Sequence, residues 1–201
     1  MSRLVEHAFY FKDPAIVARK LLGKLLVRRL GNRVISGMIV ETEAYYGEDD
    51  PASWASKGDN WIRRVMYGEP GRTLIYMVHG HWLLNVVAMP PGVPAGVLIR
   101  ALEPLEGVDL MVRNRGVNNL RLLTSGPGRL TRALAIDKSL HGLPVYKKDS
   151  PIQIIYHREI PDSEVGRSGR IGVKRDLDIP LRFYIKGNPY VSVGKKPKSS
   201  G

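Results

Sequence analysis

The segment from Met38 to Gly47 constrains the fold most, because an apolar, β-branched first half runs into an acidic and aromatic second half. Such residues favour a strand, in which successive side chains point to opposite faces. Glu41, Glu43 and Tyr45 then share one face. The other face carries residues suited to a core, namely Met38, Val40, Thr42 and Ala44. Taken alone, the pattern favours an ordinary antiparallel strand whose outer face, glutamates included, is solvated.

The residues before this segment predict a helix and a hairpin. Asp13 suits an N-cap, Pro14 the first helical position and Gly23 a stop, so a short helix is expected between them. Residues 25–29 and 34–45 then form two strands joined by a turn that contains glycine and asparagine. The segment with the two glutamates is therefore the second arm of a hairpin.

Further strands are expected over residues 73–78, 82–89, 96–102, 152–156, 181–185 and 190–193. His79, Gly80 and His81 are predicted to form the turn between the first two of these strands. A helix is predicted to open at Glu103 and Pro104 and to end before Gly116.

Residues 46–72 are polar and lack periodicity, yet they contain Trp54 and Trp61. Loops of this length in a compact domain are usually functional or disordered. Two tryptophans argue against disorder, because disordered segments contain few aromatic residues. We therefore interpret the stretch as a functional loop.

The run from residue 125 to residue 134 predicts a glycine-rich turn that leads into a helix. Free backbone amides and the helix dipole favour an anion at such a point, and two arginines add positive charge. A DNA phosphate is the predicted ligand, and the alternative is an ordinary turn with solvated arginines. The residues assigned to this contact are Ser125, Gly126, Gly128, Arg129 and Arg132.

The composition limits the class of protein. A hydrophobic content of 43% in 201 residues suits one well-cored domain, expected over residues 1–194, and residues 195–201 are expected to form a disordered basic tail. Neither a membrane span nor a secretion signal is predicted, so the expected location is the cytoplasm or nucleoid of a prokaryote or the nucleus of a eukaryote. The absence of cysteine excludes disulfides and the zinc sites of nucleobase deaminases.

The net charge of +12 points to an anionic partner. Residues 101–201 hold 18 Lys and Arg against 10 Asp and Glu, whereas residues 1–100 hold 13 against 9. A sequence pI near 10.0 is typical of proteins that meet phosphates or anionic membranes. No amphipathic basic helix or lipidation motif is present, so nucleic acid is favoured over the alternative that the charge serves solubility.

The carboxylates and aromatic residues together suit the excision of a base from DNA. Such a base must leave the duplex and stack on aromatic faces, which return roughly 1–3 kcal/mol per stack. A carboxylate must then deprotonate the water that attacks the sugar. Glu41 and Glu43 both qualify, because alternation alone does not separate them. His79 and His81 lack an identifiable third ligand, so neither a metal nor another cofactor is expected.

Four blocks of sequence resemble a known family. In chain order they are VETEAY at residues 40–45, RALEPLEG at 100–107, SGP at 125–127 and LRFY at 181–184. These blocks, in this order, resemble the alkyladenine (3-methyladenine) DNA glycosylase family over nearly the whole chain. The resemblance implies an α+β fold in a single domain, with a curved antiparallel sheet like a roll or open barrel, peripheral helices and a projecting hairpin that enters DNA.

The resemblance also implies roles for single residues. It assigns the general base to Glu43, the arginine that helps to hold the attacking water to Arg100, and two base-stacking tyrosines to Tyr45 and Tyr76. Asn85 matches an asparagine that crowds the exocyclic amine of guanine and so protects normal purines.

Two positions depart from the vertebrate members of that family. Trp54 stands where they have a pocket histidine, and since a tryptophan cannot accept the same hydrogen bond, substrate preference is expected to differ. His79 stands where they insert a tyrosine into the minor groove, and we predict that His79 intercalates instead. Lys57 lacks an apolar setting to activate it as a nucleophile, so the reaction should stop at an abasic site.

The sequence thus predicts a monomeric, monofunctional DNA glycosylase of base excision repair. Its expected substrate is double-stranded DNA with alkylated or deaminated purines of the 3-methyladenine, hypoxanthine and ethenoadenine type. One alternative is a non-catalytic nucleic-acid-binding domain. Another is a hydrolase of free nucleosides, against which the surplus of Lys and Arg argues.

Overall fold

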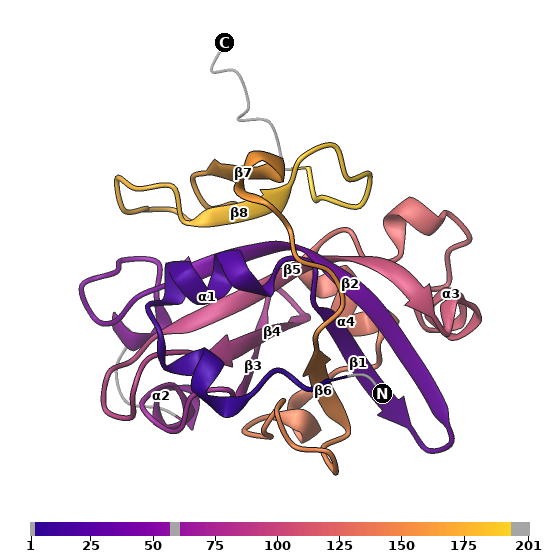
Figure 1. The fold of residues 1–201 in the computed structure, drawn as a ribbon, viewed down its shortest axis with the longest axis horizontal. Helices are drawn as coiled ribbons and strands as arrows, with labels where there is room; N and C mark the ends of the chain where they lie inside the picture. The colour runs from indigo at the N-terminus through magenta and orange to yellow at the C-terminus, as the bar shows by residue number, and fades with distance from the viewer. Residues whose placement is uncertain (1–2, 57–60, 194–201) are drawn as a thin grey trace.

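The computed structural model describes residues 3–56 and 61–193, and within them eight strands form one antiparallel sheet with short helices at its periphery (Figure 1). The α+β class and the open antiparallel sheet predicted above are confirmed. Lys57 and the expected basic tail at residues 195–201 lie outside the described residues.

The strands follow the path β3-β4-β5-β2-β1-β6, with β8 paired to β2 and β7 paired to β8. Their bounds are β1 Leu25–Leu30, β2 Arg33–Tyr45, β3 Thr73–Val78, β4 His81–Val87, β5 Gly96–Glu106, β6 Ile152–Ile155, β7 Val165–Ser168 and β8 Arg182–Ile185.

The helices are short. The α-helices are α1 Pro14–Leu21, α2 Trp61–Met66, α3 Val108–Arg115 and α4 Pro127–Ala133. Turns of 3₁₀-helix are η1 His7–Phe11, η2 Trp54–Ser56, η3 Leu120–Leu122, η4 Lys138–Leu140 and η5 Asp162–Glu164.

Strand β2 is the hub of the sheet. Along one edge its first half, residues 33–38, pairs with β1, and residues 41–43 pair with β8. Along the other edge β5 runs beside it from Ser36 to Tyr45. The two glutamates therefore stand in the interior of the sheet, where neighbouring strands approach from both sides.

One face of β2 packs against helix α1. The Thr42 hydroxyl donates to the carbonyl of Ala18 at 2.8 Å, and Val40 and Ala44 on the same face are fully buried. Helix α1 begins as its sequence predicts, because the Asp13 carboxylate accepts from the backbone amide of the second helical residue at 2.8 Å. The predicted alternation is confirmed over residues 41–45, where Thr42 and Ala44 face the core and Glu41, Glu43 and Tyr45 face the other way.

The opposite face of β2 contradicts the simplest expectation. Glu41 and Glu43 have no exposed surface, so the alternative of a solvated outer face is wrong. The chain between β7 and β8 and the residues after β8 cover this face, and both contribute hydrogen-bond donors to the carboxylates.

The helix predicted to open at Glu103 starts later than expected. Strand β5 continues to Glu106, and the chain turns into α3 at Gly107, whose φ is 70°. A Cβ at Gly107 would lie 2.6 Å from the carbonyl oxygen of Val34, so glycine is needed there. Pro104 is tolerated inside β5 because it pairs with Gly37 beside a register irregularity of the ladder.

The strand predicted at residues 190–193 is also wrong. The backbone amide of Tyr190 donates to the side chain of Asn188, and the amide of Ser192 donates to Glu41. Side chains thus take the hydrogen bonds that a neighbouring strand would need. Helix α2 was missed because six residues span less than two helical turns and show no clear period, and β7 was missed because Val165 is the only apolar side chain in its sequence VGRS.

The β3–β4 hairpin projects beyond the sheet. Its ladder spans residues 73–78 and 81–86, yet only Asn85 to Val87 of β4 pair with β5. His79 and Gly80 occupy the turn with φ of 49° and 78°, the combination that a tight hairpin turn requires. The predicted turn is confirmed.

A small hydrophobic cluster orders the long segment after β2. Ile62 and Met66 of α2 pack with Leu74 and Tyr76 of β3, and Trp54 packs against them.

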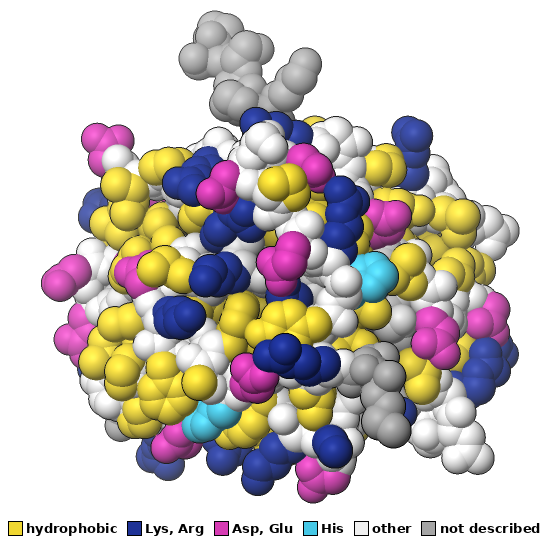
Figure 2. Space-filling model, viewed as in Figure 1, with side chains coloured by type: hydrophobic (Ala, Val, Ile, Leu, Met, Phe, Trp, Pro, Cys, Tyr) yellow, Lys and Arg dark blue, Asp and Glu magenta, His cyan; other side chains and the backbone are white. Residues whose placement is uncertain are grey.

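In the described ranges, no helix is long and apolar enough to span a membrane. On the face that Figure 2 shows, Lys and Arg are interspersed with acidic and hydrophobic side chains.

Candidate active site

Glu41 is held by four hydrogen bonds. Arg100 Nε and Arg182 Nε donate to its Oε1 at 3.0 and 2.7 Å. Ser192 donates from its amide to Oε2 at 2.6 Å and from its hydroxyl to Oε1 at 2.8 Å. Both carboxylate oxygens are occupied, and two guanidinium groups compensate the charge.

Glu43 has a different set of partners. The Ile171 amide donates to its Oε1 at 2.7 Å, while the Tyr45 hydroxyl and Arg100 Nη1 donate to Oε2 at 2.9 and 3.2 Å. Arg100 is shared with Glu41, so only one guanidinium contacts Glu43.

Burial has the largest influence on Glu43 and raises the pKa of its carboxyl above the ordinary value. Arg100, the Ile171 amide and the Tyr45 hydroxyl act in the opposite direction, because they favour the charged form. A raised pKa suits a general base, which works best when its pKa is near the operating pH.

A pair of sheet irregularities directs Arg100 toward both glutamates. In the β2–β5 ladder, Ile39 pairs with Leu102 and Glu41 pairs with Ala101, so Val40 is an extra residue on β2. The next pair is Thr42 with Ile99, so Arg100 is an extra residue on β5. Bulges of this kind re-aim side chains and often lie next to active sites. Burial alone would lower the pKa of Arg100, but the two carboxylates hold it above its ordinary value.

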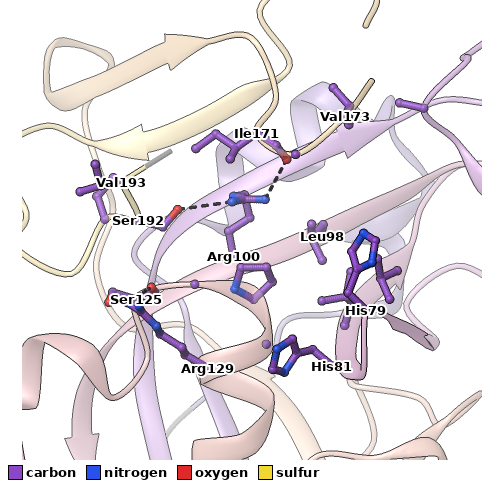
Figure 3. Close-up of a pocket in the computed structure, with 18 of the residues that line it drawn as sticks. His79, His81, Leu98, Arg100, Ser125, Arg129, Ile171, Val173, Ser192 and Val193 are labelled. Carbon is purple, nitrogen blue, oxygen red and sulfur yellow. Dashed lines mark hydrogen bonds between the residues drawn. The ribbon is translucent and has the colours of Figure 1, made fainter. Parts of the chain in front are cut away.

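A pocket of about 1320 Å³ opens directly beside Glu43. Three of its wall residues, Tyr45, Arg100 and Ile171, are the hydrogen-bond partners of Glu43. Glu43 itself lies behind this wall. In Figure 3, Arg100 extends between Ile171 and Ser192, and the dashed lines mark its contacts at 3.5 Å to the Ile171 carbonyl and 3.4 Å to the Ser192 hydroxyl.

The predicted aromatic residues gather in this pocket. Tyr45, Trp54 and Tyr76 line it, with the rings of Trp54 and Tyr76 5.1 Å apart and inclined by 54°. Asn85 does not line it. Its amide donates to the Leu74 carbonyl at 3.2 Å, and its side chain borders a cavity of only about 10 Å³ behind the aromatic residues.

The hairpin tip lies at the mouth of the same pocket. His79 is exposed and lines it together with His81 (Figure 3). Helix α4 approaches His81 closely, because a Cβ at Gly128 would lie 2.8 Å from the His81 Cβ. A glycine at position 128 therefore allows the hairpin and the start of α4 to meet.

Most of the residues predicted to bind phosphate also reach the pocket. Ser125, Gly126, Gly128 and Arg129 line it, and Arg129 Nη1 donates to the hydroxyl and carbonyl of Ser125, both at 3.1 Å. Arg132 does not line it; its side chain is bonded to the Asn114 carbonyl at 3.1 Å. Further cations on the pocket wall are Arg115, Arg121, Lys174 and Arg175.

Sequence reasoning missed four residues that contact the glutamates or their partners. They are Arg170, Ile171, Arg182 and Ser192. Arg182 lies in the LRFY block, so the resemblance of that block to the family could have identified it. No local pattern marks the others, since their contacts cross more than 90 residues of sequence. Among the described residues, no three His, Cys, Asp or Glu are arranged to hold a metal ion.

The chain belongs to the methylpurine-DNA glycosylase family, whose model matches residues 8–189. It is a DNA glycosylase of the 3-methyladenine or methylpurine class and therefore a hydrolase that acts on DNA.

Individual relatives agree with this placement. A protein of Aeropyrum pernix is 46% identical over 193 residues, which cover 96% of this chain and 94% of the relative. Proteins of Koribacter versatilis and Mesorhizobium japonicum are 42% and 46% identical, covering 94% and 90% of this chain and 92% and 86% of their own lengths. Each is named as a candidate 3-methyladenine DNA glycosylase.

Proposed function

We propose that the pocket receives a damaged purine that has left the DNA duplex, and that Glu43 is the general base for its hydrolytic release. The observation that carries this proposal is a buried carboxylate with a raised pKa, bonded to Tyr45, Arg100 and Ile171 on the wall of an aromatic pocket. Glu41 is the less suitable base, because it accepts four hydrogen bonds and contacts two guanidinium groups, whereas Glu43 accepts three and contacts one.

The reaction proposed for this site is a hydrolysis. Water held by Arg100 and Glu43 attacks the sugar carbon C1′, a C–O bond forms, and the C–N bond to the base breaks. The bonding electron pair leaves with the base, and the water proton passes to Glu43. A cationic alkylated purine departs as a neutral base, whereas a neutral purine such as hypoxanthine departs as an anion and takes up a proton from solvent water. Because the carboxylate has no exposed surface, water must reach it through the part of the pocket wall that Tyr45, Arg100 and Ile171 form. The products are a free base and an abasic sugar.

The aromatic residues are proposed to bind the extruded base. Tyr45, Trp54 and Tyr76 offer ring faces in one pocket, and stacking of this kind contributes roughly 1–3 kcal/mol per base. Asn85 contributes to discrimination in this proposal only through the aromatic residues in front of it. We propose alkylated and deaminated purines as substrates, including hypoxanthine and ethenoadenine as well as 3-methyladenine.

The hairpin tip and the arginines are proposed to contact the duplex. His79 is exposed at the pocket mouth and is the proposed wedge that fills the gap left by the base. Ser125, Gly126, Gly128, Arg129 and Arg132 are proposed to contact the flanking phosphates. The proposed substrate is double-stranded DNA. The proposed active species is a monomer of one domain, and its proposed location is the cytoplasm or nucleoid of a prokaryote or the nucleus of a eukaryote.

The test is single-turnover excision from duplexes that contain hypoxanthine, ethenoadenine or undamaged adenine, with alkali to reveal abasic sites. We expect the wild type to release a damaged base and Glu43→Gln to lose about 100- to 10,000-fold in rate, the range for a general base, while still binding the duplex. The matched control is Glu106→Gln, which removes an exposed carboxylate.

Two outcomes would replace this proposal. If the wild type binds every duplex but frees no base, the catalytic roles proposed for Glu43 and its pocket fail and only the proposed contacts with DNA are left. If it cleaves free nucleosides with little dependence on salt, it is a nucleoside hydrolase, because phosphate contacts make DNA affinity fall steeply with salt.

A further inference from the structure

Arg170 is the most enclosed cation near the site, and its side chain has no exposed surface. It follows β7, and its guanidinium binds Asp50 through Nη1 at 2.6 Å and Nη2 at 2.7 Å. Its Nε donates to Asp176 at 2.8 Å and its Nη1 to the Ala44 carbonyl at 3.1 Å. One side chain thus joins the loop after β2, the end of β2 and the segment between β7 and β8.

The guanidinium also lies over the ring of Tyr45. Its central carbon is 4.5 Å from the ring centroid, within the range of a cation–π contact. The hydroxyl of this ring donates to Glu43. The orientation of one hydrogen-bond donor of Glu43 therefore depends on Arg170.

A second donor depends on the same residue through the backbone. Ile171 directly follows Arg170, and its amide donates to Glu43 Oε1 at 2.7 Å. Asp176 fixes this backbone twice, because it accepts from the Arg170 amide at 2.9 Å as well as from the side chain. Two of the three donors to Glu43 are thus positioned from this cation.

A purely stabilising role is a weak explanation for such a cluster. Replacing a buried ion network by well-packed hydrophobic residues is often neutral or stabilising, because taking charges out of water is expensive. Although burial opposes ionisation of Asp50, the hydrogen bonds from Arg170 and from backbone amides hold the pKa of Asp50 below its ordinary value. The charged, bidentate geometry is therefore maintained at neutral pH.

We infer that Arg170 is a positioning residue of the glycosylase reaction, which holds Tyr45 and the Ile171 amide in place against Glu43. This inference rests on the role of Glu43 proposed above. Arg170 does not contact the reacting atoms; it acts through the two donors.

The inference has a signature in the pH profile. Charged or titratable groups face Glu43 from three strands, and they are Arg100 on β5, Glu41 and Tyr45 on β2, and Tyr76 on β3. The Ile171 amide and the Tyr45 hydroxyl both lower the pKa of Glu43. If they lose their places, this pKa rises further, and the acid limb of the excision rate moves to higher pH.

The experiment measures single-turnover excision of hypoxanthine from a duplex as a function of pH, together with duplex affinity. Variants are Arg170→Met, Arg170→Lys and the milder Asp176→Asn, whose partly exposed side chain makes loss of folding less of a concern. Lys24→Met is the matched control, because Lys24 is also a buried cation paired with a carboxylate, Glu159 at 2.7 Å, and does not contact Glu43.

We expect Arg170→Met to slow excision by up to about 100-fold, the loss typical of a misplaced catalytic group, and to move the acid limb upward. Arg170→Lys should recover part of the rate, Asp176→Asn should show a smaller upward movement, and Lys24→Met should leave the limb in place. Duplex affinity should be unchanged.

The inference would be overturned if the acid limb stayed at the wild-type pH in both Arg170→Met and Asp176→Asn. It would also be overturned if the excision rate of these variants fell only in proportion to the fraction of folded protein. Wild type and Glu43→Gln in the same assay separate the two levels. If Glu43→Gln excises the base as fast as wild type, the proposed function fails. If Glu43→Gln loses excision as expected but the acid limb of the Arg170 and Asp176 variants stays in place, only the inference about Arg170 is rejected.

Discussion

Glu41 and Glu43 lie two residues apart on one face of β2, and neither has any exposed surface. They differ in what surrounds them. Glu41 accepts four hydrogen bonds and meets two guanidinium groups, from Arg100 and Arg182. Glu43 accepts three and shares only Arg100.

The difference teaches that residue type and sheet face do not by themselves assign a chemical role. Both oxygens of Glu41 accept from Ser192, and Oε1 also accepts from Arg100 and Arg182. The negative charge of Glu43 is compensated by a single guanidinium group, that of Arg100. Its hydrogen-bond partners Tyr45, Arg100 and Ile171 form the pocket wall in front of it. The first arrangement favours a structural anion and the second a reactive base.

The largest effect that would sharpen this comparison is the loss of stability in Glu41→Gln. Removing one partner of a buried ion network leaves uncompensated charge, and we expect a loss of about 3–5 kcal/mol in the free energy of unfolding. Urea denaturation measures it. The exposed Glu106→Gln should change stability by no more than about 0.5 kcal/mol.

Glu41→Gln would break the comparison if it kept its stability and lost excision instead. The two carboxylates would then have exchanged roles, and Glu41 would be the base.

The next effect is kinetic and concerns Tyr45→Phe. This variant keeps the ring but removes the 2.9 Å hydrogen bond to Glu43. A hydrogen bond to a charged group contributes about 1.5–3 kcal/mol, so excision should slow by roughly 10- to 100-fold. Tyr46→Phe is the matched control, because its hydroxyl bonds to Asp13 at 3.0 Å, away from Glu43. Equal rates for the two variants would argue against a role for the Tyr45 hydroxyl.

The smallest effect is the pH dependence of stability in Glu43→Gln. Burial raises the pKa of Glu43 in the folded protein. The stabilising contribution of this carboxyl is therefore complete below its unfolded pKa and is lost as pH rises through its folded pKa. The Tm of wild type relative to Glu43→Gln should fall as pH rises. A difference that grows in the opposite direction would mean that the folded pKa is lowered.

Local sequence signals predicted the parts of the fold that depend on neighbouring residues. The N-cap at Asp13, the β1–β2 hairpin, the turn at His79 and the alternation along β2 all follow from short-range stereochemistry. The switch from β5 to α3 was misplaced, because a close approach of Gly107 to Val34 decides it. That contact joins the turn before α3 to strand β2, which is distant in sequence.

The candidate site shows the same division. The sequence by itself determined that Glu41, Glu43 and Tyr45 share a face, since a strand alternates whatever packs on it. Only the tertiary structure decided that both carboxylates are buried and which donors each of them accepts from. Ser192 and Ile171 arrive from chain segments more than 120 residues away. The physical reason is that burial and hydrogen-bond partners set the pKa of a carboxyl group, and here both come from contacts distant in sequence.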